Sequence, residues 1–219
     1  MARKIETLFI NGPAGRLEAR LEEPEDRDPI EAALVCHPHP QHGGTMLNKV
    51  VHRVALGLRR SGCVVLRFNY RGVNLSEGKY DDGVGEVEDA RAALSFLLAR
   101  YPALPVTIAG FSFGSRIALK LGCELGYPRR VIAVGFPTVY TDRSYLEGCT
   151  LPRVFIQSTH DEFGPMADLE PFVAALPEPK KLIAIPASDH FFVDALPELE
   201  NAVRTLDRET LIHYVQSDQ

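Results

Sequence analysis

The chain alternates between short apolar runs and segments in which apolar residues recur at helical spacing. Ala32–Cys36, Cys63–Phe68 and Val131–Gly135 are almost wholly apolar runs of strand length, which is typical of strands covered on both faces of a parallel sheet. In Glu86–Arg100, apolar residues recur every three or four positions, with acidic residues on the opposite side. This alternation predicts an α/β fold with a mostly parallel central sheet and helices on both of its faces.

The same patterns predict the remaining elements. Further strands are expected at Lys4–Ile10, Arg16–Leu21, Pro105–Ala109, Val154–Gln157 and Lys181–Ile185, and further helices at Asn48–Arg60, at Phe113–Leu125 and from near Asp194. No repeat, low-complexity tract or long linker interrupts the chain. We therefore expect a single domain over residues 1–219.

Charge and hydropathy argue against several kinds of partner. The 219 residues carry a formal net charge of −5, and the sequence pI is about 5.8, whereas binding to nucleic acid or to an anionic membrane needs a basic face. No apolar run follows the basic residues at the N-terminus, and no apolar stretch is long enough to span a bilayer. We expect no signal peptide, no membrane partner and no nucleic-acid partner, and the sequence indicates no oligomeric state.

The cysteines suggest a compartment. Cys36, Cys63, Cys123 and Cys149 are scattered, without a CxxC pair or a dense framework. Cys36 and Cys63 lie in strand-like apolar runs, where buried free thiols are expected. These features predict a protein of the reducing cytoplasm.

The clearest chemical signal is the sequence GFSFG at Gly110–Gly114. It lies between the predicted strand Pro105–Ala109 and the predicted helix Phe113–Leu125. In that setting GxSxG is a nucleophile elbow, in which the serine takes a strained conformation at a sharp turn and the two glycines let strand and helix pass close beside it. A merely structural turn is the alternative, but the context favours Ser112 as a catalytic nucleophile.

A serine hydroxyl attacks only when a base accepts its proton and a third group orients that base. Hydrolases with this motif place the acid, and then the histidine, after the serine in the chain. Asp161 follows the predicted strand Val154–Gln157, and His190 follows Lys181–Ile185. Because both follow strands of a parallel sheet, they are expected at the same sheet edge as Ser112. We predict that these three residues form a catalytic triad.

Other residues are weaker candidates for the same roles. The alternative acids are Glu162, Asp189 and Asp142. His160 precedes the predicted acid, and His213 lies in the predicted terminal helix, so both are weaker candidates for the base.

A histidine-rich loop follows the strand Ala32–Cys36. Acyl transfer creates an oxyanion, which backbone N–H groups stabilise when they are aimed at it. In this kind of site one donor follows the nucleophile, and the other comes from a loop after a neighbouring strand. The two prolines of the loop have no N–H. We therefore predict the N–H groups of Phe113 and His39 as the oxyanion hole, with Gln41 as the alternative to His39.

The same loop also has the spacing of a metal site. His37, His39 and His42 form an HxHxxH pattern, and histidine is a common zinc ligand. Pro38 and Pro40 restrict the loop, however, and no carboxylate follows at a matching spacing. We predict no metal site and no cofactor.

Taken together, these motifs resemble those of the small, lidless bacterial α/β hydrolases of the dienelactone-hydrolase-like branch. The resemblance rests on His37–Pro40, Gly43–Met46, Asn48-Lys49, Phe68–Gly78 and Gly110–Gly114, together with Asp161 and His190. It implies the α/β-hydrolase fold without a lid domain, and a role for Arg71–Gly78 in supporting the oxyanion side of the site.

The sequence departs from that pattern at two positions. Asn74 stands where similar proteins usually have glycine, and asparagine tolerates the left-handed conformation better than most residues. Dienelactone hydrolases proper use a cysteine nucleophile, whereas residue 112 is serine.

The substrate is predicted to be small. Only Phe136–Pro152 separates two of the predicted strands, which is too short for a helical cap domain, so an open site is expected. Four phenylalanines are candidates for lining it: Phe111, Phe136, Phe163 and Phe191.

The predicted function is a serine hydrolase, specifically a carboxylesterase, that cleaves small-molecule carboxylic esters through an acyl-enzyme intermediate. One alternative is a peptidase or amidase of the X-Pro dipeptidyl-peptidase-like type, because similar catalytic domains occur there. The chain lacks room for the extra domain that usually selects peptides. The other alternative is a non-enzymatic binding protein that retains the fold.

Overall fold

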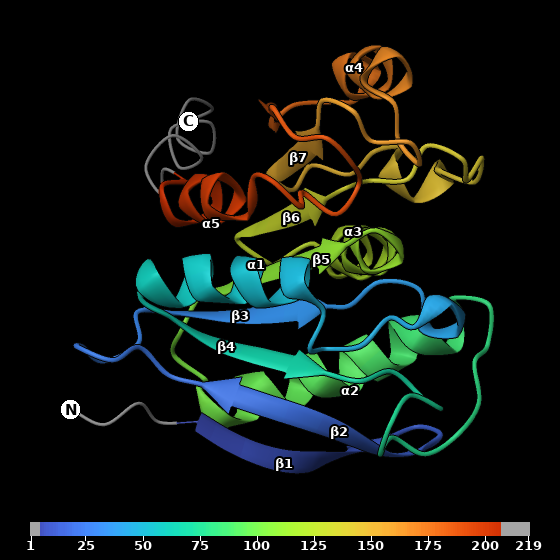
Figure 1. The fold of residues 1–219 in the computed structure, drawn as a ribbon. Coiled ribbons are helices and arrows are strands. Elements are labelled where there is room, and N and C mark those ends of the chain that lie inside the picture. The colour runs from blue at the N-terminus through green and yellow to red at the C-terminus, as the bar shows by residue number, and fades with distance from the viewer. Residues whose placement is uncertain (1–4, 207–219) are drawn as a thin grey trace.

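One eight-stranded sheet runs through the computed structural model, which describes residues 5–206 (Figure 1). Its strands are β1 (Ile5–Gly12), β2 (Gly15–Glu22), β3 (Glu31–Cys36), β4 (Cys63–Phe68), β5 (Val106–Phe111), β6 (Arg130–Val134), β7 (Arg153–Ser158) and β8 (Lys180–Ile185). Their order across the sheet is β1-β2-β4-β3-β5-β6-β7-β8. The hairpin β1–β2 joins β4 in antiparallel pairing, and every pair from β4 to β8 is parallel.

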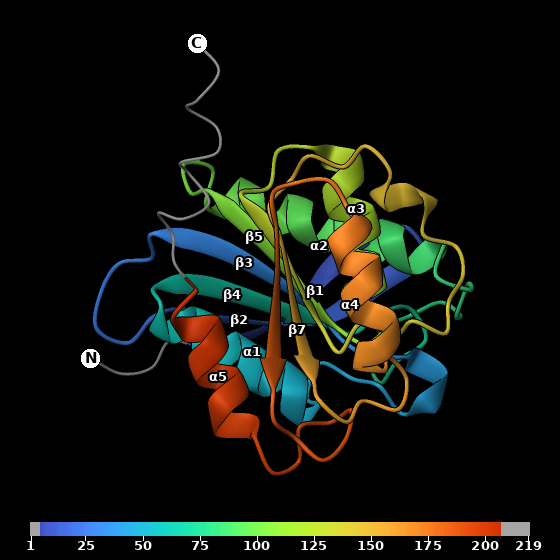
Figure 2. The same cartoon turned by 90° about the horizontal axis from the view of Figure 1, so that it is seen from above.

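Helices cover both faces of this sheet (Figures 1 and 2). They are α1 (Lys49–Arg60), α2 (Gly85–Arg100), α3 (Phe113–Leu125), α4 (Met166–Ala175) and α5 (Leu196–Arg204). The buried residues of α1 and α5 belong to one apolar core, and those of α2, α3 and α4 belong to a second. This arrangement confirms the predicted α/β architecture.

The strand residues alternate between the two cores. In β3, Ala32, Leu34 and Cys36 pack into the core beneath α2 and α3, whereas Ala33 and Val35 pack beneath α1. Successive side chains of a strand point to opposite faces, so a strand covered on both faces is apolar at most of its positions. That is why the central strands read as continuous apolar runs in the sequence.

The predicted elements agree with the structure in kind and place, with one exception. Helix α4 was not predicted, because Pro171 lies inside it and only Leu169 and Val173 of its residues are buried, which leaves a weak helical pattern. Two predicted features, the strand start at Lys4 and the base candidate His213, lie outside the described residues.

Within residues 5–206, no lid domain covers the sheet edge. The segment between β6 and β7 holds only a short 3-10 helix, Ser144–Leu146. No helix in the same part of the chain is both long and apolar enough to cross a membrane.

The cysteines divide into two pairs with different states. Cys36 and Cys63 are buried free thiols, as predicted. Cys123, at the end of α3, forms a disulfide with Cys149, in the segment that follows β6. No pattern in the sequence predicts this bond, which joins residues 26 positions apart. Because disulfides are rare in reducing compartments, it removes support from the cytoplasmic prediction.

Candidate functional site

Three loops at one edge of the sheet hold the predicted triad residues. Ser112 follows β5, Asp161 follows β7 and His190 follows β8. These strands run parallel, so their carboxyl ends meet at one edge, where open α/β sheets bind ligands.

Ser112 occupies a strained turn between β5 and α3. Its backbone has φ 56° and ψ −121°, a region that costs on the order of 1–3 kcal/mol for a residue with a side chain. The surrounding backbone fixes this conformation, since Ser112 N–H donates to the Val134 carbonyl at 2.9 Å and the Ser112 carbonyl accepts the Ser115 N–H at 2.9 Å. The serine therefore lies at the N-terminus of α3, where the helix dipole favours negative charge.

Two glycines make this turn possible. A Cβ on Gly110 would lie 2.0 Å from the carbonyl oxygen of Gly114, and one on Gly114 would lie 2.4 Å from that of Cys36. No side chain fits at such distances, which accounts for both glycines of the motif.

Asp161 and His190 form a buried hydrogen-bonded pair. The Asp161 Oδ2 atom lies 2.7 Å from His190 Nδ1. The other carboxylate oxygen, Oδ1, accepts the backbone N–H groups of Phe163 at 2.9 Å and Gly164 at 2.8 Å. The carboxylate is therefore held by three partners, and His190 keeps its Nε2 atom for another group.

The alternative acids have other partners. Glu162 accepts the backbone N–H of His190 at 3.0 Å, and Asp189 accepts the N–H groups of Phe191 and Val193. The Asp142 carboxylate accepts hydrogen bonds from the backbone N–H and the hydroxyl of Ser144, at the start of a 3-10 turn. Their roles in the fold are to fix loops.

Ser112 and His190 line one cavity of about 270 Å³. Its walls come from the loop after β3, from the segment after β6 and from the residues that follow Asp161 and His190. Of the four phenylalanines predicted as candidates, Phe163 and Phe191 line the cavity, whereas Phe111 and Phe136 belong to the apolar cores.

His37 fixes the base of the histidine-rich loop. Its Nε2 accepts the N–H of Tyr70 at 3.1 Å, and its Nδ1 lies 2.7 Å from the Pro38 carbonyl. Both ring nitrogens are thus engaged with the backbone, which leaves neither for a metal. Burial lowers the pKa of His37 to about 3, so the ring is neutral and donates from Nδ1.

The side chain of His39 organises the rest of this loop. Its Nδ1 accepts the backbone N–H of Gln41 at 3.3 Å, and its Nε2 lies 3.2 Å from the hydroxyl of Tyr80. The ring also stacks on His42 and contacts Phe113. Burial, with His42 nearby, lowers the pKa of His39, which favours the neutral ring that these two hydrogen bonds require.

The backbone N–H groups of this region are not equivalent. Within the described part of the chain, those of His39 and Phe113 donate to no protein group, whereas that of Gln41 donates to His39. An N–H that is already engaged is a poorer oxyanion donor. This difference favours His39 over Gln41 as the second donor.

Three residues that support the site were not predicted from the sequence. Tyr80 supports His39, as described above. A Cβ on Gly135 would lie 3.1 Å from His190 Cε1 and 2.8 Å from the Phe111 ring, so this glycine makes room for the catalytic candidate. Phe192 is buried with φ 53°, a left-handed conformation that is rare for a bulky residue.

The Arg71–Gly78 loop contributes no residue to the wall of the Ser112 cavity, and its role in supporting the oxyanion side stays a prediction. Asn74 has φ 49°, the left-handed conformation that asparagine tolerates. Arg71 anchors the loop through its guanidinium and N–H, which both donate to Asp89. The loop leads directly to Tyr80, which reaches His39.

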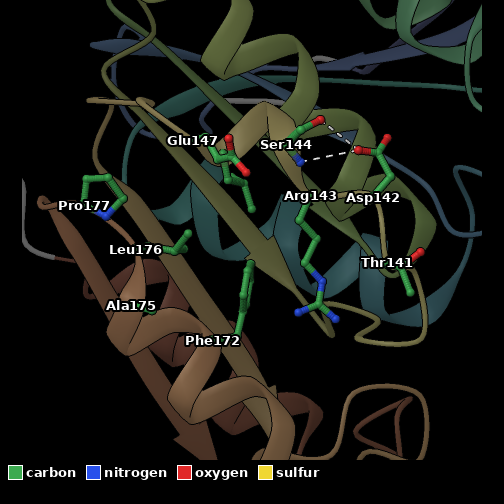
Figure 3. Close-up of a pocket in the computed structure, with 10 residues that line it drawn as sticks. Thr141, Asp142, Arg143, Ser144, Glu147, Phe172, Ala175, Leu176 and Pro177 are labelled. Atoms are coloured by element: carbon green, nitrogen blue, oxygen red, sulfur yellow. Dashed lines mark hydrogen bonds between the residues drawn. The ribbon is translucent and has the colours of Figure 1, made fainter.

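A larger pocket elsewhere lacks comparable chemistry. It has a volume of about 480 Å³ and lies between residues 141–147 and helix α4 (Figure 3). Its polar side chains serve the fold, since Arg143 donates to the carbonyls of Tyr140 and Thr138 and Asp142 accepts Ser144. The candidate site is therefore the Ser112 cavity.

We expect the substitution His37→Asn to weaken the pH dependence of stability. The unfolded chain binds a proton at His37 below its ordinary pKa of 6.5, whereas the folded chain binds it only near pH 3. Between these values acid therefore lowers the free energy of unfolding of the wild type. Urea unfolding at about pH 7.5 and about pH 5, on either side of the reference pKa, measures the effect.

The variant is expected to be less stable at both pH values, because it loses the ring that accepts the Tyr70 N–H. Its difference between the two pH values should nevertheless be smaller than that of the wild type. An unchanged difference would show that His37 does not carry this dependence.

A strained serine at the N-terminus of a helix, beside a buried Asp–His pair at one edge of a mostly parallel sheet, defines a hydrolase of the α/β type. Comparison with known proteins agrees. The model of the family described as "Alpha/beta hydrolase domain" matches residues 32–206, and the chain belongs to this family. This confirms the superfamily that the motifs resemble.

Three relatives illustrate the similarity. The structure of an alpha-beta serine hydrolase homologue from Coxiella burnetii is 36% identical, has a TM-score of 0.87, and the match covers 91% of this chain and 95% of that one. A serine hydrolase without a lid from Xanthomonas campestris is 30% identical, has a TM-score of 0.85, and its match covers 100% and 98% of the two chains. An uncharacterized protein of Rickettsia prowazekii is 38% identical over an alignment of 206 residues, and the match covers 90% of this chain and 86% of that protein.

Proposed function

We propose that this hydrolase cleaves small, uncharged carboxylic esters through an acyl-enzyme intermediate, with Ser112, Asp161 and His190 as its catalytic triad. The observation that carries the proposal is the 2.7 Å contact between Asp161 Oδ2 and His190 Nδ1, at a cavity that Ser112 also lines. The whole chain, residues 1–219, is proposed to act as one domain.

The first half of the reaction forms the acyl-enzyme. Ser112 Oγ attacks the acyl carbon while His190 Nε2 takes the hydroxyl proton, and Asp161 stabilises the resulting imidazolium. The N–H groups of His39 and Phe113 bind the oxyanion, assisted by the dipole of α3. The ester C–O bond then breaks, and His190 gives its proton to the leaving alcohol.

The second half returns the enzyme to its resting state. A water molecule attacks the acyl carbon while His190 takes one of its protons. The bond from the acyl carbon to Ser112 Oγ breaks, the serine regains its proton from His190, and the carboxylic acid leaves. No cofactor or metal takes part in either half of this scheme.

Two measurements test the proposal against its alternatives. Labelling with a fluorophosphonate requires an activated serine, so its absence would favour a non-enzymatic binding protein. Comparison of small aryl esters with peptide anilides separates esterase from peptidase activity. A screen of small esters, with Ser112→Ala as the control, then narrows the substrate.

The proposed partner is a small-molecule ester, with no nucleic acid and no membrane. The cytoplasm remains a prediction from the sequence. The Cys123–Cys149 disulfide argues against it, because reducing compartments disfavour such bonds.

We expect His39→Pro to lower kcat by roughly 10²–10³ relative to His39→Ala, the usual effect of losing one oxyanion donor. Both variants lack the imidazole, so both lose the contacts to Gln41 and Tyr80 and should be impaired relative to the wild type. Only proline also removes the N–H. His39 has φ −54° and ψ 121°, which a proline ring adopts without strain.

Melting temperatures of both variants must accompany the kinetics, because proline at this position also restricts the preceding residue. Equal kcat values for the two folded variants would assign the second donor elsewhere. Inhibition of the wild type by chelators would instead indicate a metal.

A further inference from the structure

The proposed reaction fixes which wall of the cavity faces the alcohol part of an ester. The tetrahedral carbon carries four groups: Ser112 Oγ, the oxyanion, the acyl chain and the leaving oxygen. The oxyanion points to the N–H groups of His39 and Phe113. The leaving oxygen must lie beside His190, because that residue supplies its proton. The alcohol part therefore extends along the side chains that flank His190.

Two phenylalanines form that flank, and we call them the aromatic pair. The ring centroid of Phe163 lies 4.8 Å from that of His190, and that of Phe191 lies 5.3 Å from it. Both line the cavity. Their exposed fractions are 45% and 44%, so a large part of each residue is free to contact a bound molecule.

The backbone of Phe163 is fixed in place. Its N–H donates to Asp161 Oδ1 at 2.9 Å, and its carbonyl accepts the N–H of Thr138 at 3.0 Å. The next residue, Gly164, donates to the same carboxylate oxygen. An exposed ring on so constrained a backbone is preorganised for binding.

The backbone of Phe191 is fixed in a similar way. Its N–H donates to Asp189 Oδ1 at 3.0 Å. The following residue, Phe192, is fully buried with φ 53°. This strained residue anchors the loop in the core, so the turn leaves Phe191 exposed beside His190. Strain of this kind is typical of ligand-binding segments.

The described cavity wall beside the aromatic pair carries no charged side chain, and the nearest carboxylates, Glu162 and Asp189, accept backbone N–H groups of His190 and Phe191. Among the described residues, none that lines the cavity is Asp, Glu, Lys or Arg. Arg116 is close by, but its guanidinium lies over the ring of Tyr140, 3.7 Å from the centroid. Val139, which also lines the cavity, is a further exposed apolar residue. A carboxylate on the alcohol part would thus lose its hydration here and meet no Lys or Arg in the described cavity wall.

We propose that the aromatic pair is the binding subsite for the alcohol part of the ester and takes an uncharged, apolar ring. This inference rests on the proposed function, because the hydrolytic reaction is what places the leaving group beside His190. The acyl part then occupies the remainder of a cavity of about 270 Å³, so it is expected to be short.

Four acetate esters test the subsite: those of ethanol, cyclohexylmethanol, benzyl alcohol and 4-(hydroxymethyl)benzoate. Each kcat/KM is divided by the ester's rate of alkaline hydrolysis to remove differences in intrinsic reactivity. The two uncharged ring esters are expected to exceed ethyl acetate by roughly tenfold or more, on the usual strength of ring contacts. The carboxylate-bearing ester should lose that advantage.

Phe163→Ala and Phe191→Ala should each reduce the ratio of benzyl to ethyl acetate hydrolysis by roughly three- to tenfold. The ratio is the relevant readout, because any disturbance of His190 affects both substrates alike. Tyr127→Ala is the matched control, since Tyr127 is an exposed aromatic residue just beyond the far end of α3 and should leave the ratio unchanged.

The outcomes separate this inference from the proposed function. Hydrolysis without a preference for ring esters, or a preference that survives both alanine variants, would overturn the subsite and leave the esterase proposal standing. Absence of both hydrolysis and fluorophosphonate labelling would overturn the proposed function, and the subsite with it.

Discussion

Replacing Ser112 by alanine is expected to lower kcat for ester hydrolysis by about 10⁴–10⁶ and to abolish fluorophosphonate labelling. Removal of the nucleophile from a triad typically has an effect of this size, because the remaining groups cannot replace the covalent step. The protein should stay folded, since the backbone hydrogen bonds that hold residue 112 do not involve its hydroxyl. Initial rates with a small aryl ester, together with intact-mass analysis after labelling, measure both effects.

Ser95→Ala provides the matched control for this substitution. Ser95 lies on α2, and its hydroxyl donates only to the carbonyl of Arg91 one turn earlier. Its replacement should leave both labelling and turnover unchanged. If Ser112→Ala retained esterase activity near that of the control, Ser112 would not be the nucleophile.

Most of the sheet could be predicted because burial on both faces imposes a simple pattern. The runs Ala32–Cys36 and Cys63–Phe68 match β3 and β4 closely, since nearly every position in them is apolar, the exception being Arg67, which pairs with Glu22. Helix α4 lies at the opposite extreme. Only Leu169 and Val173 of its residues are buried, so the sequence shows too few apolar positions at helical spacing to predict a helix there.

The reactive residues of the candidate site could be predicted because each of them follows the end of a strand. Ser112, Asp161 and His190 each come soon after an apolar run, and a parallel sheet brings such positions to one edge. The structure places the last two in direct contact. The assignment of all three as catalytic residues remains a proposal that the experiments above decide.

The supporting residues could not be predicted, because their roles depend on contacts between distant segments. Tyr80 reaches His39 across 41 positions of sequence, and no local pattern specifies that meeting. The glycine at 135 owes its role to the His190 ring beside it. The bond between Cys123 and Cys149 likewise depends on how α3 lies against the segment that follows β6.

Asp161→Asn is expected to lower kcat by about 10⁴, the effect known when the acid of such a triad is neutralised. The asparagine Oδ1 can still accept the N–H groups of Phe163 and Gly164, so the loop and the fold should persist. Its Nδ2 group would then face His190 Nδ1 and donate to it. That contact places the imidazole proton on Nε2, where it prevents His190 from accepting the proton of Ser112.

Glu162→Gln tests whether the acid has been assigned to the correct residue. The two carboxylates are neighbours in sequence, but within residues 5–206 the Glu162 carboxylate hydrogen-bonds only to the backbone N–H of His190, at 3.0 Å from Oε2. A glutamine oxygen accepts the same hydrogen bond, so this variant should retain most of the wild-type kcat. Both variants are compared with the wild type in kcat and in melting temperature. A severe loss of kcat in Glu162→Gln, with a mild loss in Asp161→Asn, would assign the acid to Glu162. Only the residue that orients the imidazole should affect turnover so strongly without unfolding the chain.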